Sequence, residues 1–317
     1  NMKERKIAAN RNCIYDLSNS GPSGQSTVEF VNVKNKAKRI ETPLPELPED
    51  VKTSIINNFK KGVNLNIMFN NMTKNIIQST SSNRVYFKLL AHIVESHQLS
   101  PDIFVISKLP EFSEMDISFQ FWSRIFHLIF SSSSTLKIKS GEKKLESSSF
   151  KIDYKIGCNI KGKFMTLSCV EIGRFVNDAK VRDDHHKLLL EGKVIINNII
   201  KNFPFIDPNC IAIFNLQICG MKGDFIETIL GNKKKYIAHR PLDRLRAPLH
   251  RNNNKIIDTF LRQLMYYKNY VETLCHDIEQ MVNENDDKSA SFGETLDTNT
   301  FKPPNFLDWI DDNVERL

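Results

Sequence analysis

The sequence lacks the cysteine patterns of a zinc-binding or disulfide-bonded domain. Its 317 residues include six cysteines, and none of them forms a C-x-x-C pair. This spacing argues against the common zinc motifs and against a disulfide framework. Several of the cysteines lie in apolar, strand-like runs, where a thiol behaves as a small hydrophobe. We interpret all six as reduced thiols of an intracellular protein: Cys13, Cys158, Cys169, Cys210, Cys219 and Cys275.

Long apolar runs and the common catalytic motifs are also missing. No apolar run reaches about 18 residues, so the sequence predicts no transmembrane helix and no membrane partner. The first residues, NMKERKIAANRN, lack the apolar core of a signal peptide. The sequence contains no P-loop, nucleophile elbow, G-x-G-x-x-G or kinase motif. These absences argue against the membrane proteins and against the enzyme classes that those motifs mark.

What the sequence does contain is enough apolar material for a core and an excess of positive charge. Hydrophobic residues make up 40% of the chain, with 21 Phe, which argues against wholesale disorder. The formal net charge is +7, which suits an anionic partner such as nucleic acid and favours a nuclear over a cytoplasmic location. The basic segment VKNKAKR (33–39) is either an import or phosphate-contacting segment or a solvated linker.

Composition divides the chain into four segments. Residues 1–50 predict a flexible arm, because SNSGPSGQST and the proline-rich TPLPELPED lie there. Residues 51–112 show apolar residues at helical spacing and predict a helical extension. Residues 113–245 change between helical and strand periods and predict the core. Residues 246–317 predict a second helical extension, with a long helix over 252–283, a polar break, and a short amphipathic helix in PPNFLDWIDDNVERL.

The core segment reads as helix, three strands, helix and two strands. The first helix lies in SEMDISFQFWSRIFHLIFSSS, and the strands in TLKIKSGEKK (with SGEKK as a turn), SFKIDYKIGCNI and FMTLSCVEIG. The second helix, RDDHHKLLLEGKVIINNIIKNF, has Asp183 or Asp184 as its expected cap. CIAIFNLQICG, DFIETIL and KKYIAHR complete the sheet. This order predicts an α/β (α+β) fold: a mixed central sheet flanked by helices.

Two adjacent strands of this core each carry an acid, Asp153 and Glu171. Strand interiors usually exclude acids, so either both side chains face water or they share a site. The segment from about 113 to 240 resembles the PD-(D/E)xK, or restriction-endonuclease-like, nuclease superfamily. It is also similar to expanded uncharacterised fungal proteins that combine VE-x-(A/G)-(R/K) with KLL-x-E-G-K.

This resemblance implies a core of helix, three strands, helix and strand, with a metal site for Mg²⁺ or Mn²⁺. Asp153 would match the metal-binding Asp, and Glu171 the acid of the (D/E)-x-K motif. Two carboxylates can hold a hard cation that keeps several waters. The cation could then activate a water and stabilise charge on a phosphate.

The sequence departs from the family where the motif needs its lysine, because Gly173 stands there. Several residues could replace the lost cation. Lys155 lies two residues after Asp153 and shares its face of the strand. Lys187 and Lys193 lie on the following helix, from which a lysine could reach in, and Glu114 or Gln120 could add a polar contact. The expected catalytic set is therefore Asp153, Glu171, Lys155 and Lys187.

Basic clusters elsewhere predict contacts to a nucleic-acid backbone or, alternatively, solvated loops. HRPLDRLRAPLHR gathers arginines whose guanidinium groups suit phosphates, and GNKKKY adds a lysine run. His185 and His186 fit the polar start of a helix better than a metal site. The expected nucleic-acid contacts are Arg240, Arg244, Arg246, Arg251, Lys233, Lys234 and Lys235.

Three hypotheses follow from these patterns. The first is a metal-dependent nuclease acting on DNA, with RNA as a second substrate. The second is a catalytically inactive module on the same core, which binds nucleic acid or serves as a subunit, with a protein partner or a second copy held through the C-terminal helices. The third is an α+β scaffold without nucleic acid.

Overall fold

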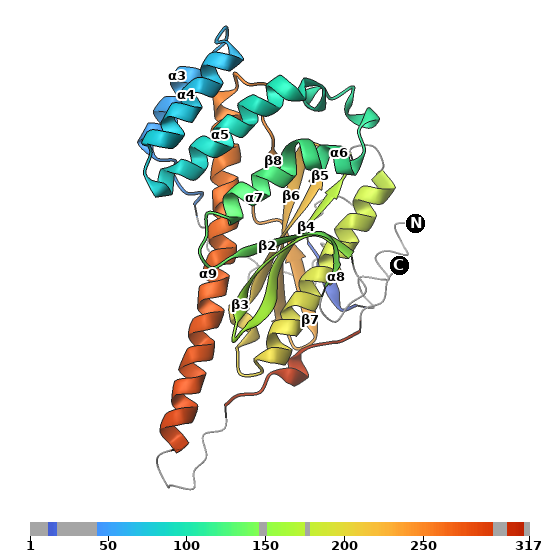
Figure 1. Ribbon diagram of the computed structural model, residues 1–317. Coiled ribbons are helices and arrows are strands. Elements are labelled where there is room, and N and C mark those ends of the chain that lie inside the picture. Colours follow the sequence, from blue (N-terminus) through green and yellow to red (C-terminus); the bar gives the residue numbers. More distant parts are fainter. Residues whose placement is uncertain (1–11, 18–42, 146–150, 175–177, 294–302, 314–317) are drawn as a thin grey trace.

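The computed structural model describes residues 12–17, 43–145, 151–174, 178–293 and 303–313. They form a mixed sheet with helices on both of its faces, which confirms the predicted α/β class (Figure 1). The basic segment 33–39 lies outside the described residues.

The sheet has eight strands in the order β1-β7-β6-β5-β4-β3-β2, with β8 paired to β6. β4 and β5 run parallel, as do β1 and β7, and the other pairs are antiparallel. The long apolar strand β5 lies in the middle, as expected for a strand buried on both faces. The bounds are β1 Ile14–Asp16, β2 Lys137–Lys144, β3 Lys151–Ile160, β4 Lys163–Gly173, β5 Ala212–Cys219, β6 Lys222–Asn232, β7 Lys235–His239 and β8 Leu245–Arg246.

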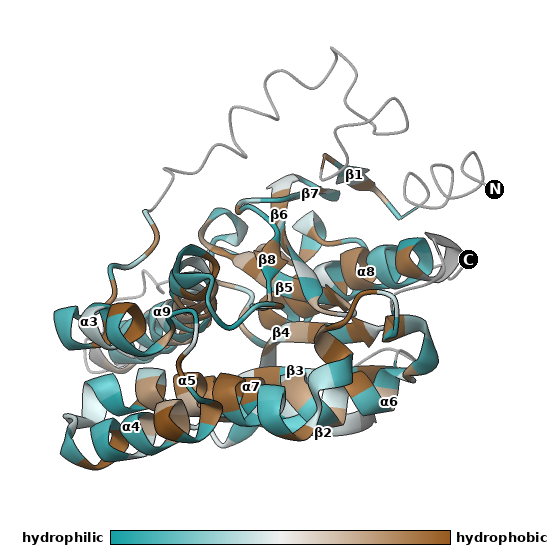
Figure 2. Ribbon diagram, turned by 90° about the horizontal axis from the view of Figure 1, so that it is seen from above, coloured by the Kyte–Doolittle hydropathy of each residue, from teal (hydrophilic) through white to brown (hydrophobic). Residues whose placement is uncertain are grey.

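Helices cover both faces of the sheet, and the three helices between Glu49 and Leu99 form a further cluster (Figure 2). α8 packs on β4, β5 and β6, while α9 and α7 pack against the opposite face. The helices are α3 Glu49–Asn58, α4 Leu65–Gln78, α5 Ser81–Leu99, α6 Glu114–Ile117, α7 Ser123–Phe130, α8 Asp178–Asn202 and α9 Asn254–Gly293. A π-helical turn, Ser118–Trp122, joins α6 to α7, and short 3₁₀ turns occupy Pro101–Phe104, Leu109–Glu111, Pro208–Cys210 and Leu307–Trp309.

The β3–β4 hairpin is the element that the sequence predicts best. KGK was expected to connect the strands, and Lys161 and Gly162 do so with φ of 48° and 77°. A two-residue turn with positive φ matches the twist of an antiparallel pair, and glycine adopts it without strain. The turn sets the register as far as Gly157 opposite Thr166, and a β-bulge beyond it shifts the register by one residue, so that Tyr154 lies opposite Val170.

Glycine also sets the distance between α8 and the sheet. A Cβ on Gly192 would lie 2.5 Å from Oγ1 of Thr228 on β6, closer than real contacts allow. The absence of a side chain therefore lets this turn of α8 rest directly on the sheet. The neighbouring residue Glu191 is consequently buried between the helix and the strands, with 0% of its surface exposed.

Several predicted element boundaries are wrong. SGEKK is not a turn, because β2 continues through Gly141 at positive φ, with an irregular register between Ser140 and Lys143. α8 begins at Asp178, so neither Asp183 nor Asp184 is its cap. α9 continues through the expected polar break to Gly293, because extending an existing helix costs far less than nucleating one.

Segments near both ends of the described chain contact the sheet or the loops beside it. The predicted flexible arm includes β1, which pairs with β7. The predicted tail helix is wrong for residues 303–313, which contain only one 3₁₀ turn. Backbone groups of this segment form hydrogen bonds with neighbouring segments instead. The Phe306 N–H donates to the Pro204 carbonyl at 2.8 Å, and the Trp309 carbonyl accepts from the Lys234 N–H at 2.6 Å. These partners replace the bonds that a helix would make within itself.

Candidate functional site

The two acids singled out in the sequence lie on the same face of the β3–β4 hairpin. Tyr154 and Val170 are opposite each other on the face toward α7 and α9, so the next positions, Asp153 and Glu171, lie together on the α8 face. The Asp153 Oδ2 atom accepts a hydrogen bond from the Ile172 N–H at 2.8 Å. Glu171 is only 5% exposed. The alternative in which both acids simply face water is therefore wrong.

A lysine on α8 reaches this pair. The Lys187 Nζ atom lies 2.7 Å from Oε2 of Glu171 and 3.8 Å from Oε1 of Glu191. Lys187 and Glu191 are four residues apart and so share one face of the helix. One carboxylate from β4 and one from α8 thus flank a single ammonium group, and the charge of Asp153 also acts on it.

Sequence reasoning missed Glu191, although a signal was present. The acid interrupts the apolar run LLLEGKVII, four residues after a lysine. Among the described residues, neither of its carboxylate oxygens has a hydrogen-bond partner, and Oε1 of Glu171 also has none. A buried acid without hydrogen bonds is costly, and it needs a proton or a cation nearby.

Burial raises the pKa values of the two buried acids of the cluster. It raises the pKa of Glu171 to about 7, against the opposing effect of Lys187. Burial also raises the pKa of Glu191 well above its ordinary value, and the charge of Glu171 and the hydrogen bond that the two carboxyl groups form when they share a proton raise it further. One lysine therefore does not offset the burial of both acids, and a proton shared between them reduces their negative charge.

Gly173 leaves room beside Glu171 for side chains from α8. It lies on the same face as Glu171, where a Cβ would come within 3.0 Å of Oδ2 of Asp184. The space that a side chain at position 173 would occupy is thus used by side chains from α8. This arrangement places Lys187 beside Glu171 from the helix rather than from the strand.

Polar residues continue the acid site across the sheet. Glu171 pairs with Gln217 on β5, which pairs with Asp224 on β6, so all three lie on one face. The Gln217 amide donates to the Val181 carbonyl at 2.6 Å. Asp224 accepts two hydrogen bonds of 2.8 Å from Arg244, and Arg240 lies 3.4 Å away. The predicted arginine loop is therefore attached to the same row as the acids.

The other candidate lysines differ in position. Lys155 is buried, 4% exposed, on the strand of Asp153. Lys193 lies away from the acids, where its Nζ atom donates to the Asn12 carbonyl at 2.9 Å, to the Asn313 carbonyl at 2.6 Å and to Asp311 at 2.6 Å. Lys193 thus connects α8 to the segments around Asn12 and Asp311. His185 pairs with Asp16 of β1 at 2.9 Å, which is also a structural contact.

The predicted phosphate contacts separate into two groups. Arg246 lies exposed on β8, opposite Lys222 at the end of β6 nearest the acid row, and Arg251 is partly exposed on the following loop. Lys233 and the neighbouring Lys234 and Lys235 lie beyond the other end of β6, at Asn232, about 33 Å along the strand from Lys222. There Lys233 pairs with Asp308. The two groups therefore cannot both contact the segment of a ligand that lies at Glu171.

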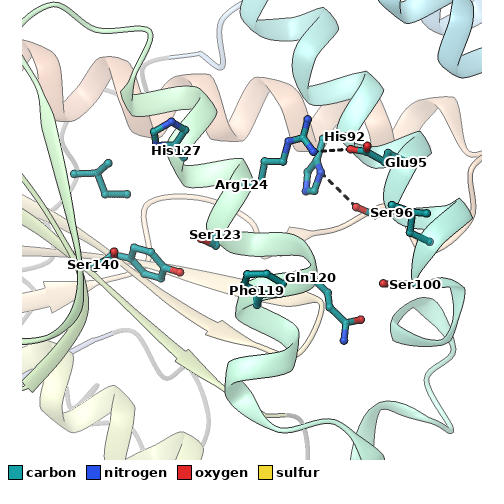
Figure 3. Close-up of a pocket in the computed structure, with 13 residues that line it drawn as sticks. His92, Glu95, Ser96, Ser100, Phe119, Gln120, Ser123, Arg124, His127 and Ser140 are labelled. Atoms are coloured by element: carbon teal, nitrogen blue, oxygen red, sulfur yellow. Dashed lines mark hydrogen bonds and ion pairs between the residues drawn. The ribbon is translucent and has the colours of Figure 1, made fainter.

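Two cavities lie near these elements. One of about 970 Å³ lies between the β7–β8 segment and the first turns of α9. Its lining includes Arg240, Arg244, Arg246 and Lys255, and it meets the acid row at Asp224. Another of about 690 Å³ lies between α5, α7 and the β2–β3 pair, on the face of the sheet opposite the acids (Figure 3). Arg124 and Glu95 pair there at 2.6 Å, and Gln120 lines this cavity. Tyr154 lines it as well, facing away from its neighbour Asp153.

The acid cluster offers the ligand type of a hard divalent cation, although no three of its described acids bring ligand atoms within 4.8 Å of one another. Mg²⁺ and Mn²⁺ prefer carboxylate oxygens, and Oε1 of Glu171 and both oxygens of Glu191 have unused acceptor capacity. Asp153 and Glu171 come from neighbouring strands, as the predicted ligand pair requires.

Comparisons with family models, curated proteins and solved structures gave no match to this chain. Within the described residues, no helix is both long enough and apolar enough to span a membrane.

Proposed function

We propose that this protein hydrolyses nucleic-acid phosphodiesters with a divalent metal ion, with DNA as the first substrate and RNA as the second. The observation that carries the proposal is the convergence of Asp153, Glu171 and Lys187, from two strands and the following helix. The order of elements from α6 to β5 is helix, three strands, helix and strand, which agrees with the order of the PD-(D/E)xK core. The second and third strands carry the two acids, as in that family.

The roles of the residues follow from their chemistry. Asp153 and Glu171 would hold Mg²⁺ or Mn²⁺, which when bound supplies a Lewis acid and an activated water. Lys187 neutralises Glu171 in the metal-free protein, and with the carboxylate charge satisfied it can donate to a phosphate oxygen. Glu191, when it loses its proton, adds negative charge behind the pair and increases the preference of the site for a cation.

The cavity lined by Arg240, Arg244, Arg246 and Lys255 supports a phosphodiester substrate. Asp224, which lies in its lining, is two strands away from Glu171, or about 10 Å across the sheet. A nucleic-acid strand at the acids would therefore pass cationic side chains at the neighbouring phosphates. A nuclear location is part of this proposal, because DNA is the first substrate.

The test is a cleavage assay on single- and double-stranded DNA and RNA with Mg²⁺, Mn²⁺ or a chelator. We expect metal-dependent cleavage that is lost in Asp153→Ala and in Glu171→Ala. Glu95→Ala, an acid on the opposite side of the sheet, is the matched control and should cleave normally. Cleavage that persists in either cluster variant would refute the catalytic assignment.

Gly173 favours a second candidate, an inactive nuclease-like module that binds nucleic acid or joins a larger assembly through α9. In that case Lys187 is a permanent ion-pair partner of Glu171 and no metal is needed. Binding without cleavage in any metal, unchanged in Glu171→Ala, would identify this function.

A further inference from the structure

A second group of metal-ligating side chains lies on the face of the sheet opposite the acid cluster. Cys158 on β3 and Cys275 and Glu279 on α9 bring one ligand atom each to within 4.8 Å of one another. Both thiols are buried, each 1% exposed, and Glu279 is partly exposed. The three residues come from β3 and α9, two elements that are in contact with each other.

The geometry of the two elements accounts for this convergence. Cys275 and Glu279 are four residues apart and therefore lie on the same side of α9. Ile278 and Val282, at neighbouring positions, are buried against the sheet and fix the rotation of the helix. Cys158 precedes the hairpin turn by two residues and faces α9. A hydrogen bond with Cys158, together with burial, raises the pKa of the Cys275 thiol.

We propose that Cys158, Cys275 and Glu279 form a zinc site that fastens α9 to β3. Two soft thiolates and one hard carboxylate form a mixed ligand set that suits the borderline ion Zn²⁺ rather than Mg²⁺. Zinc prefers four ligands, and the partly exposed side of Glu279 leaves a position for a water molecule. On binding, both thiol protons pass to solvent and the sulfurs become ligands. The site is independent of the acid cluster in position and in ligand chemistry.

Sequence spacing alone hides such a site. The usual zinc motifs bring paired ligands from one short segment, whereas here the two thiols belong to a strand and to a helix far along the chain. The cross-link would hold α9 near its middle, beyond which the helix continues to Gly293.

The experiment measures metal content and metal spectra on the full chain. Protein purified without a metal-affinity step and dialysed with zinc should contain about one zinc ion per chain. Titration with Co²⁺ should give the absorption of a thiolate–cobalt complex. Cys158→Ser and Cys275→Ser should abolish both signals, and Glu279→Gln should weaken zinc binding tenfold or more.

Cys169→Ser is the matched control, because Cys169 is equally buried but lies on the α8 face of β4; it should bind zinc as the wild type does. Circular dichroism verifies that each variant folds, and Co²⁺ titration of the folded wild type tests the site even if a serine variant does not fold. Wild-type protein without zinc or cobalt binding, unchanged binding in the folded variants, or a Cys158–Cys275 disulfide by mass would each overturn the proposal.

Discussion

The Nζ atom of Lys187 on α8 lies 2.7 Å from Oε2 of Glu171 on β4. Two residues after Glu171, the sequence has Gly173, at the position where the proposed resemblance to the (D/E)-x-K motif would place a lysine. The cation beside Glu171 thus comes from the neighbouring helix α8. The side chain of Asp184, on the same helix, occupies the space where a side chain at position 173 would lie. Moving the cation between the helix and the strand tests whether Lys187 takes the role of a lysine at position 173.

Moving the lysine back to the strand should partly restore activity. We expect Lys187→Ala to reduce cleavage at least about 100-fold, because the charge facing the phosphate is lost. Adding Gly173→Lys should recover part of that loss, since the new ammonium would be attracted by Asp184 and lies on the face of Glu171. Single-turnover cleavage rates measure both effects. The double variant Gly173→Ala/Lys187→Ala is the control. Equal cleavage rates in this variant and in Gly173→Lys/Lys187→Ala would contradict the idea that a lysine at position 173 can replace Lys187.

The two lysines on α8 should differ in what their removal affects. Lys193→Met loses its contacts to Asn12, Asp311 and Asn313, and we expect the free energy of unfolding to fall by about 3 kcal/mol. Lys187→Met should change stability less, because Glu171 and Glu191 can take up protons, but it should abolish cleavage. Urea unfolding and cleavage assays on both variants measure this. The reverse pattern would show that Lys193 is the functional lysine.

The stability of the metal-free protein should fall as the pH rises. Glu171 and Glu191 bind protons more tightly in the folded than in the unfolded protein, so raising the pH through their folded values removes stability. For Glu171 the window is pH 4.5 to about 7 and the loss is at most roughly 3 kcal/mol. Urea unfolding in a chelator should show a flatter pH profile for Glu171→Gln.

Magnesium should reverse this slope, because a cation binds the deprotonated cluster. We expect the melting temperature to rise with added Mg²⁺ at pH 8 and little at pH 5.5, by an amount set by the ratio of concentration to Kd. Glu95→Gln should behave as the wild type in both experiments. An equal magnesium effect in Glu171→Gln would place the ion elsewhere.

The salt dependence of nucleic-acid binding should distinguish the two basic groups. Each phosphate contact contributes about 0.9 to the slope of log affinity against log salt. Arg246→Ala and Lys255→Ala, in the cavity beside the acid row, should each reduce the slope by about 1. Lys233→Ala, at the other end of β6, should leave it unchanged. Fluorescence anisotropy in a chelator measures the slopes, and the opposite result would move the binding surface to the β6–β7 turn.

Much of the core could be predicted from residue patterns. The alternating periods around KGK predicted the β3–β4 hairpin, and the apolar run of β5 predicted a central strand. Boundaries that depend on distant partners were missed: the tail forms backbone bonds to Pro204 and Lys234 rather than a helix, and β1 is a strand because β7 provides its edge.

At the site, a register shift between Ile156 and Gly157 places Asp153 and Glu171 on one face, whereas the register of the turn alone would pair Asp153 with Val170 and send Glu171 to the other face. The sequence offered several lysines without a means to choose, because the choice depends on the rotation and depth of α8. Packing of Gly192 on Thr228 sets that depth, and it brings Lys187 to the acids, buries Glu191 behind them and turns Lys193 away. The local sequence therefore determined which strands carry the acids, whereas helix-on-sheet packing, a contact between residues far apart in the chain, decided which cation completes the cluster.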